Sequence, residues 1–124
     1  MPPEKTFTFK PYPFSLEERM CLTIAHYSSN NRICINLLYF DLSCKGFLPY
    51  ATLTVNIPNA KLTAPNCVFL DTNNCQFAER LLIETLHVAE RTNHYATSGF
   101  CIYPEVALDI DKLSDYIYFR EENK

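Results

Sequence analysis

The clearest structural signal in the sequence is residues 20–42, MCLTIAHYSSNNRICINLLYFDL. Residues 20–27 and 33–42 are two runs rich in β-branched and aromatic residues, and the segment between them is a cluster of serine and asparagine that favours a turn. This arrangement predicts a β-hairpin. Both faces of the second run are largely apolar, so we expect that strand to lie in the middle of a sheet.

Further strands are expected on both sides of the hairpin. Residues 6–9 alternate polar and aromatic side chains before Pro11 and Pro13, which predicts an edge strand or an extended arm within residues 1–14. Residues 50–57 alternate cleanly, so one set of side chains should meet the core and the other set water or a partner. Residues 67–70 form a short apolar strand. Residues 95–103 are expected to be a returning strand, with Gly99 as a bulge or a point of close approach.

One amphipathic helix is predicted over residues 75–90. Four residues with capping side chains precede it at positions 71–74, and the segment contains neither glycine nor proline. A second, short helix is expected at the C-terminus, within residues 111–124. The apolar stripe of the main helix consists of Phe77, Ala78, Leu81, Leu82, Leu86 and Ala89.

Together these elements predict an α+β fold in a single domain spanning residues 1–124. We expect a mainly antiparallel sheet of about five strands, with the helix at residues 75–90 packed across one face. A chain of 124 residues with 48% hydrophobic residues is long enough to form one core without disulfides or a metal.

The charge balance restricts the classes of ligand. Fourteen acidic and eleven basic residues give a net charge of −3, and the basic residues are scattered along the chain. Direct binding to nucleic acid or to an anionic membrane is therefore not expected, and a basic partner surface fits better. The N-terminal residues lack the apolar region of a signal peptide and no apolar run could span a bilayer, so a cytoplasmic location is expected.

The six cysteines suggest two kinds of chemistry, neither of which the spacing favours. Cys75 lies where the helix dipole would lower the pKa of a thiol, and His87 or His94 could act as its base, so a thiol enzyme is one alternative. No C-x₂-C pair and no histidine pair at helical spacing is present, so no metal site is predicted. No cofactor is expected either, because two glycines cannot supply a phosphate-binding loop. We therefore expect reduced, structural cysteines and a protein that is not an enzyme.

A protein-binding sheet face is the stronger hypothesis. Strand alternation should turn a set of tyrosine and threonine side chains away from the core, and tyrosine is enriched at protein interfaces. The alternative is that these tyrosines pack beneath the terminal segments. A self-complementary contact through this face would instead give a homodimer or a homo-oligomeric structural module. The candidate binding residues are Tyr50, Thr52, Thr54, Tyr95 and Tyr103.

The chain resembles a bacterial family of short proteins with a domain of unknown function. Three blocks of the sequence carry the resemblance: PYATLTVN at residues 49–56, FLDTNN at 69–74 and SGFCIYP at 98–104. The resemblance covers residues 33–104. It implies a small accessory protein of a conjugative element or prophage that binds a host protein. An inhibitor of a host defence nuclease, of the anti-CRISPR or anti-restriction type, is the function that this context implies, with no catalytic residues to carry over.

Overall fold

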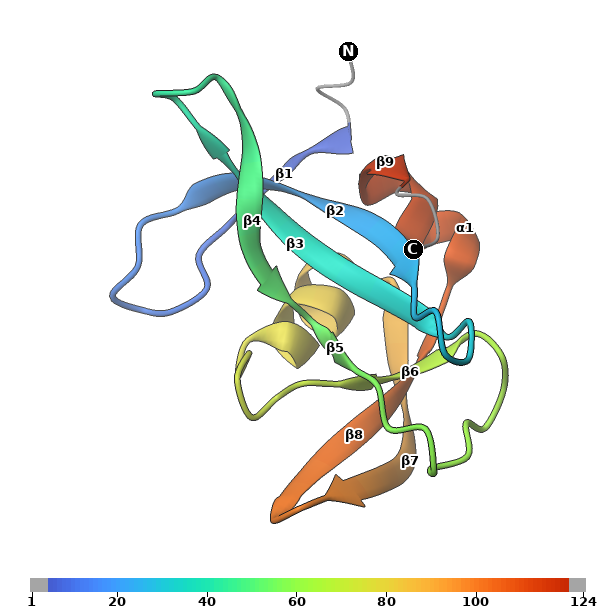
Figure 1. Cartoon of the computed structure of the whole chain (residues 1–124). Helices are drawn as coiled ribbons and strands as arrows, with labels where there is room; N and C mark the ends of the chain where they lie inside the picture. The colour runs from blue at the N-terminus through green and yellow to red at the C-terminus, as the bar shows by residue number, and fades with distance from the viewer. Residues whose placement is uncertain (1–4, 121–124) are drawn as a thin grey trace.

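The computed structural model describes the backbone of residues 5–120 and the side chains of residues 5–118. In the described chain the strands form two sheets, one of five strands and one of four (Figure 1). The five-stranded sheet, sheet A, consists of β1 (Phe7–Phe9), β2 (Glu18–His26), β3 (Ile33–Asp41), β4 (Gly46–Thr52) and β9 (Ile117–Arg120). The four-stranded sheet, sheet B, consists of β5 (Thr54–Val55), β6 (Cys67–Leu70), β7 (Ala89–Ser98) and β8 (Cys101–Leu108).

The predicted hairpin is confirmed as β2 and β3. The two strands pair antiparallel from Met20 opposite Tyr39 to His26 opposite Ile33. β3 pairs with β4 on its other side, so it is a central strand as its apolar faces predict. The expected edge strand is β1, which pairs with the first part of β2. Residues 1–4 of the expected arm lie outside the described residues.

Sheet B corrects the expected returning strand at residues 95–103. Those residues form a hairpin, in which Ser98 pairs with Cys101 across a turn of Gly99 and Phe100. Gly99 has a φ of 63°, a left-handed value that glycine adopts without strain. Gly99 is therefore the turn residue rather than a bulge, and the segment contributes to two strands instead of one.

The predicted helix at residues 75–90 is wrong in type and extent. The helical element there is the π-helical segment η2 (Arg80–Thr85), in which Leu86 N–H donates to the Leu81 carbonyl at 2.9 Å, five residues back. His87 then takes a positive φ of 57°, which ends the helical path, and β7 begins two residues later. All six residues of the expected apolar stripe are buried, so the periodicity identified the buried side chains but not the geometry.

The predicted terminal helix is also largely replaced. α1 (Ile110–Leu113) and the 3₁₀ turn η3 (Ser114–Tyr116) are short, and β9 follows them directly and pairs in parallel with β2. Asp109 caps α1, since its side chain accepts from the Lys112 N–H at 3.2 Å. The remainder of the expected helix, residues 121–124, lies outside the described residues.

The fold is therefore not α+β with a packed amphipathic helix. It is a mostly antiparallel β structure of two sheets, with η2 filling the space beside them (Figure 1). The main core gathers residues from sheet A, sheet B and η2, among them Leu22, Leu37, Leu82 and Val106. A smaller cluster lies on the other face of sheet B and consists of Ile57, Phe69, Ala96 and Tyr103.

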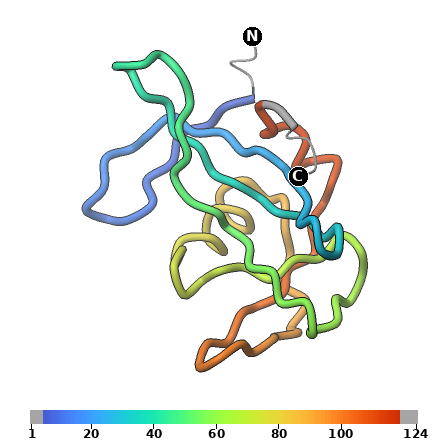
Figure 2. Tube along the Cα trace, viewed as in Figure 1, coloured from blue at the N-terminus to red at the C-terminus, as the bar shows by residue number. Residues whose placement is uncertain are grey.

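Among the segments that project from this body, two that lead in different directions carry exposed phenylalanines (Figure 2). One is the loop between β1 and β2, residues 10–17, and the other is the end of the β7–β8 hairpin. In the part of the chain that is described, no helix is long and apolar enough to cross a membrane.

Candidate protein-interaction site

The five predicted binding residues do not share one face. Tyr50 and Thr52 are exposed on β4, where the Thr52 hydroxyl donates to the Asn36 side-chain oxygen at 2.8 Å. Tyr95 is 53% exposed but lies on sheet B. The structure thus brings only Tyr50 and Thr52 together on an open surface.

The other two predicted residues, Thr54 and Tyr103, are buried. The Thr54 hydroxyl lies 3.0 Å from the Tyr27 hydroxyl and accepts the Ile35 backbone N–H at 3.3 Å. Tyr103 belongs to the small cluster of sheet B, on the opposite face of the hairpin from Tyr95.

The strand expected at residues 50–57 is wrong: the chain leaves sheet A after Thr52 and enters sheet B at Thr54, and the adjacent Leu53 and Thr54 are both buried, so the expected alternation fails there. At Tyr103 the face that was expected to be open is covered by Ile57, Ala60 and Leu62.

Aromatic side chains form a series of ring contacts that passes through the buried Phe77, and Tyr50 is part of it. Phe14 stacks on Tyr12 with ring centroids 5.3 Å apart, and Tyr12 meets Phe77 edge-on at 5.5 Å. Phe77 lies 6.1 Å from Tyr50, which contacts Tyr39 at 6.1 Å. These five residues are called the aromatic strip below. The strip runs from the projecting loop, through the core residue Phe77, to β4 and β3 of sheet A.

The loop that carries Phe14 is held in place by Arg80 of η2. The Arg80 guanidinium donates to the carbonyl oxygens of Lys10 and Pro11, at 3.0 and 2.6 Å, and lies over the Phe9 ring at 4.7 Å. The Ser15 N–H closes a turn by donating to the Tyr12 carbonyl at 2.9 Å. The beginning of the loop is thus hydrogen-bonded to η2, whereas Phe14 is 86% exposed.

The sequence patterns did not identify Tyr12, Phe14 and Tyr39 as candidate binding residues. Tyr12 and Phe14 lie in the segment Pro11–Phe14, where two prolines alternate with two aromatic residues. Proline restricts the backbone and so reduces the entropy lost when a neighbouring side chain is held in position. This alternation of proline and aromatic residues is the sequence pattern that could have identified Tyr12 and Phe14. Tyr39 carries no comparable signal, because its contact with Tyr50 depends on the pairing of β3 with β4.

The electrostatic surroundings of Tyr50 are acidic. Burial raises the pKa of the Tyr50 phenol, and the nearby Tyr12, Glu18 and Cys75 raise it further. The phenol therefore remains neutral and able to donate a hydrogen bond at physiological pH. Aromatic faces next to a carboxylate attract cations, so this surface suits a partner with arginine or lysine side chains.

A groove of about 310 Å³ lies beside Tyr50. Its walls combine apolar surface with the hydrogen-bonded pair of Asn36 and Thr52. A protruding side chain of a partner could occupy it. The groove is lined by Asn36, Leu38, Pro49, Tyr50, Ala51 and Thr52.

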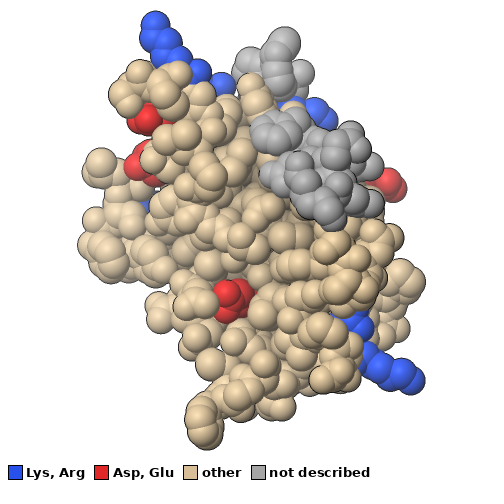
Figure 3. Space-filling model, viewed as in Figure 1, with Lys and Arg blue, Asp and Glu red and all other residues tan. Residues whose placement is uncertain are grey.

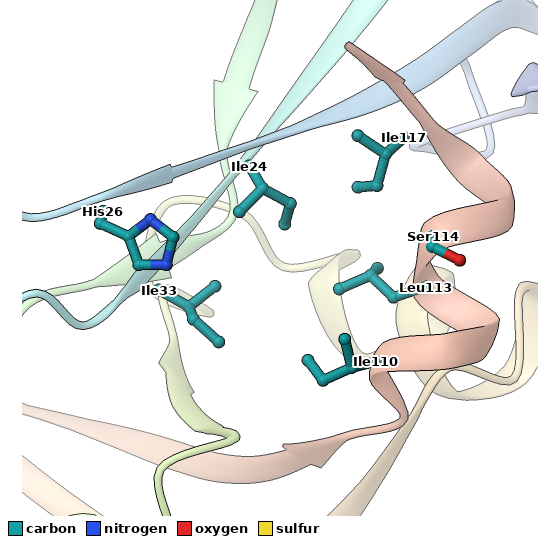
Figure 4. Close-up of a pocket in the computed structure, with 7 residues that line it drawn as sticks. All are labelled: Ile24, His26, Ile33, Ile110, Leu113, Ser114 and Ile117. Atoms are coloured by element: carbon teal, nitrogen blue, oxygen red, sulfur yellow. The ribbon is translucent and has the colours of Figure 1, made fainter. Parts of the chain in front are cut away.

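A second, smaller pocket of about 140 Å³ lies between the ends of β2 and β3 and the segment that contains α1 (Figure 4). Five of its seven lining residues are isoleucine or leucine, and His26 and Ser114 are the polar ones. The Ser114 hydroxyl already donates to the Asp111 carbonyl at 2.6 Å. The pocket has the chemistry of a site for a small apolar group and lacks a nucleophile–base pair.

The buried carboxylate of Glu105 lies at the centre of a cluster of hydrogen bonds at the base of the β7–β8 hairpin. Its carboxylate accepts from the Thr63 N–H at 2.8 Å and from the hydroxyls of Thr63 and Thr92, at 2.6 and 2.5 Å. Burial alone would raise the pKa of Glu105, but these hydrogen bonds and the neighbouring His94 outweigh it and lower the pKa. The carboxylate joins the loop at Thr63 to the irregular part of β7.

Cys75 does not have the surroundings of a nucleophile. Its Sγ donates to the Thr52 carbonyl at 3.4 Å, and burial followed by the charge of Asp71 raises the pKa of the thiol. Neither His87 nor His94 is hydrogen-bonded to Sγ in the described chain. All six cysteines are free, and burial raises the pKa of Cys21 to about 12 despite Arg19. Among the described residues no group of three or more metal-ligating side chains is found.

The chain belongs to the DUF4313 family, a domain of unknown function, whose sequence profile matches residues 21–122. This confirms the expected membership of a family with an uncharacterised domain. No curated protein and no solved structure matches the chain. The matched residues include Tyr39, Tyr50 and Phe77, whereas Tyr12 and Phe14 precede them.

Proposed function

We propose that this protein acts by binding another protein through the aromatic strip and the adjacent groove. The observation that carries the proposal is the unbroken series of ring contacts from the exposed Phe14 to Tyr39. An isolated exposed aromatic residue needs no explanation. An exposed aromatic side chain on a loop that is hydrogen-bonded to the body of the protein, in contact with a series of further rings, has the character of a binding hot spot.

The ordering of the loop supports this proposal energetically. A flexible loop would lose conformational entropy on binding, which reduces affinity. Here Arg80 already fixes the loop backbone in the free protein. Burial of the Phe14 ring against a partner would then contribute roughly 2 kcal/mol, with little offset from ordering.

The partner that fits is a protein with a cationic and apolar surface. Glu18 lies near Tyr50, and the whole chain carries a charge of −3. Enzymes that act on nucleic acid present such basic surfaces. We therefore extend the proposal to an accessory protein of a mobile element that occupies the basic surface of a host nuclease. Small size, acidic charge and the family resemblance support this extension.

Affinity capture with matched variants tests the binding proposal. Wild-type protein, Phe14→Ser and Phe100→Ser are immobilised and exposed to lysate of the source organism, and retained proteins are quantified by mass spectrometry. Phe14 and Phe100 are both strongly exposed phenylalanines, so Phe100→Ser controls for a general loss of hydrophobic surface. The proposal expects a partner that wild type and Phe100→Ser retain and that Phe14→Ser loses at least tenfold.

The two levels of the proposal can fail separately. A partner retained equally by all three proteins would contradict binding through the strip. A partner that depends on Phe14 but neither binds nor cleaves nucleic acid would contradict the nuclease assignment alone. Titration of the captured enzyme with the protein, in a nucleic-acid cleavage assay, decides that second point.

A further inference from the structure

Residues 57–63, between β5 and β6, form a strap across one face of sheet B. The strap is part of the light-green loop that follows β5 in Figure 1, and it contains no strand or helix. Its apolar side chains pack on Phe69 and Tyr103 in the small cluster, whose buried members are all different from those of the main core. The strap can therefore separate from sheet B without opening the main core. The apolar side chains of the strap are Ile57, Ala60 and Leu62.

The backbone of the strap is not paired with either sheet. The Ala60 N–H donates to the Ile57 carbonyl at 3.0 Å, which is a bond within the strap. In the described chain no backbone–backbone hydrogen bond joins residues 57–63 to another segment. Pairing resumes beyond the strap, where the Leu108 N–H donates to the Asn66 carbonyl at 3.0 Å. A segment without such pairing belongs to the part of a structure that opens most easily.

Arg32, which directly precedes β3, holds the first half of the strap. Its guanidinium donates to the carbonyl oxygens of Ile57 and Ala60, at 3.0 and 2.8 Å. The salt bridge found among the described residues joins Arg91 to Glu79, outside the strap. Figure 3 likewise shows scattered charged side chains, without a large patch of one sign on the face in view. Hydrogen bonds from side chains, rather than ion pairs, therefore fix this half.

Glu105 and His94 hold the second half of the strap. The Glu105 carboxylate accepts from the N–H and the hydroxyl of Thr63, at 2.8 and 2.6 Å. His94 Nε2 lies 3.2 Å from the Lys61 carbonyl oxygen. The strap is thus attached through side chains at both ends, and loss of a few hydrogen bonds is enough to release it.

We propose that the strap opens as one unit while both sheets stay paired, and that Arg32, His94 and Glu105 form the latch that keeps it closed. The strap is then a conformational device that controls access to the covered face of sheet B. Local opening of this kind needs less free energy than unfolding of the whole chain. This inference does not depend on the aromatic strip, since none of the strip residues belongs to the small cluster.

Opening of the strap also uncovers a thiol. Cys67 lies on the same face of β6 as Phe69, two positions away, and it lines a small pocket together with Leu62 of the strap. The side chain is 1% exposed, so the thiol reacts only in an open state. Cys21 of β2 is equally buried, at 0% exposure, but lies in sheet A. Cys67 therefore reports opening of the strap, and Cys21 reports unfolding of the chain.

The first test is the rate at which N-ethylmaleimide modifies the two thiols of the folded wild-type protein, measured by mass spectrometry. Each rate is divided by the rate of the same cysteine in the unfolded protein. We expect Cys67 to react at least about tenfold faster than Cys21. Low urea concentrations should accelerate Cys21 more, because unfolding of the chain exposes more surface. Equal normalised rates would overturn the proposal.

The second test asks whether the two halves of the strap open together. The Thr63 N–H is bound by Glu105 and not by Arg32, so Arg32→Ala changes its hydrogen exchange only if the strap opens as a unit. We expect exchange at Thr63 to rise about tenfold in Arg32→Ala. It should stay unchanged in the control Arg91→Ala, and exchange at residues 68–70 of β6 should stay unchanged in both. An unchanged Thr63, or an equal rise at residues 68–70, would overturn the proposal.

Discussion

The two projecting segments expose aromatic side chains but are anchored in different ways. The loop at residues 10–17 rests on Phe77, which is buried in the main core and contacts Phe9, Tyr12 and Tyr50. The β7–β8 hairpin has at its base the carboxylate of Glu105, which is 1% exposed and bound by threonine side chains. The first anchor combines the apolar Phe77 ring with the Arg80 guanidinium, and the second is a carboxylate.

This difference shows how one small protein can hold two surfaces independently. An apolar anchor depends on packing and does not respond to pH, whereas a buried carboxylate stabilises the fold only while it is ionised and fully hydrogen-bonded. Perturbing one anchor should therefore affect its own segment first. The predictions below use substitutions that separate the two anchors, ordered by the size of the expected effect.

Phe77→Ala should have the largest effect. Removing a buried phenylalanine lowers the free energy of unfolding by about 3–5 kcal/mol through lost burial and the remaining cavity. Because Tyr12 and Tyr50 both pack on this ring, hydrogen exchange should increase in residues 10–17 more than in residues 95–104. Urea unfolding and hydrogen exchange measure the two effects. Equal increases in both segments would show that the strip has no separate anchor.

Glu105→Gln is the matching change at the ionic anchor. The amide keeps the volume but replaces two acceptor oxygens with one acceptor and one donor, so a hydrogen bond from Thr63 or Thr92 is lost. We expect the free energy of unfolding to fall by about 1–3 kcal/mol. Hydrogen exchange should now rise at residues 90–104 rather than at 10–17. The opposite distribution would contradict the role assigned to Glu105.

The pH dependence of stability follows from the same carboxylate. The folded-state pKa of Glu105 lies below its usual value of 4.5, so the ionised form stabilises the folded state. This stability is complete above the unfolded-state pKa and is lost as pH falls from there through the folded-state pKa. Wild type should lose more stability than Glu105→Gln between neutral pH and pH about 3. If the free energy of unfolding fell equally with pH in both proteins, Glu105 would be excluded as the source of the pH dependence.

Arg80→Ala should have a smaller and local effect. It removes the two hydrogen bonds to the loop carbonyls and the contact over Phe9, for an expected loss of about 1–2 kcal/mol. The control is Arg91→Ala, which removes an ion pair to Glu79 at 3.0 Å on the surface and should cost at most about 1 kcal/mol. Thermal unfolding compares the stability of the two variants. Hydrogen exchange at residues 10–17 should rise only in Arg80→Ala.

Local patterns in the sequence predict much of sheet A. The β2–β3 hairpin follows from two runs of β-branched and aromatic residues around a turn cluster, and both strands lie where those runs lie. The helix fails because burial of Phe77, Leu82 and Leu86 is compatible with more than one backbone path. A wider π turn followed by a left-handed His87 buries the same side chains and leaves Ala89 free to begin β7.

The candidate surfaces are less predictable, because they depend on contacts between distant segments. Tyr50 could be proposed from alternation along its strand. Its neighbour Phe77 was expected on a helix, and Tyr12 lies in a prolyl loop whose position depends on Arg80. Alternation likewise cannot show that residues 57–63 cover the face of β8 that holds Tyr103. Tertiary layers decide which of two alternating faces is exposed.

The most direct test of the central claim, that the aromatic strip binds another protein, is photo-cross-linking with benzoylphenylalanine in place of Phe14. The same group at Ile102 serves as the comparison, and both proteins are irradiated in lysate of the source organism. We predict that position 14 joins the chain to a different protein, which position 102 does not reach. Position 14 giving no adduct, or only the adducts found at position 102, would contradict the account.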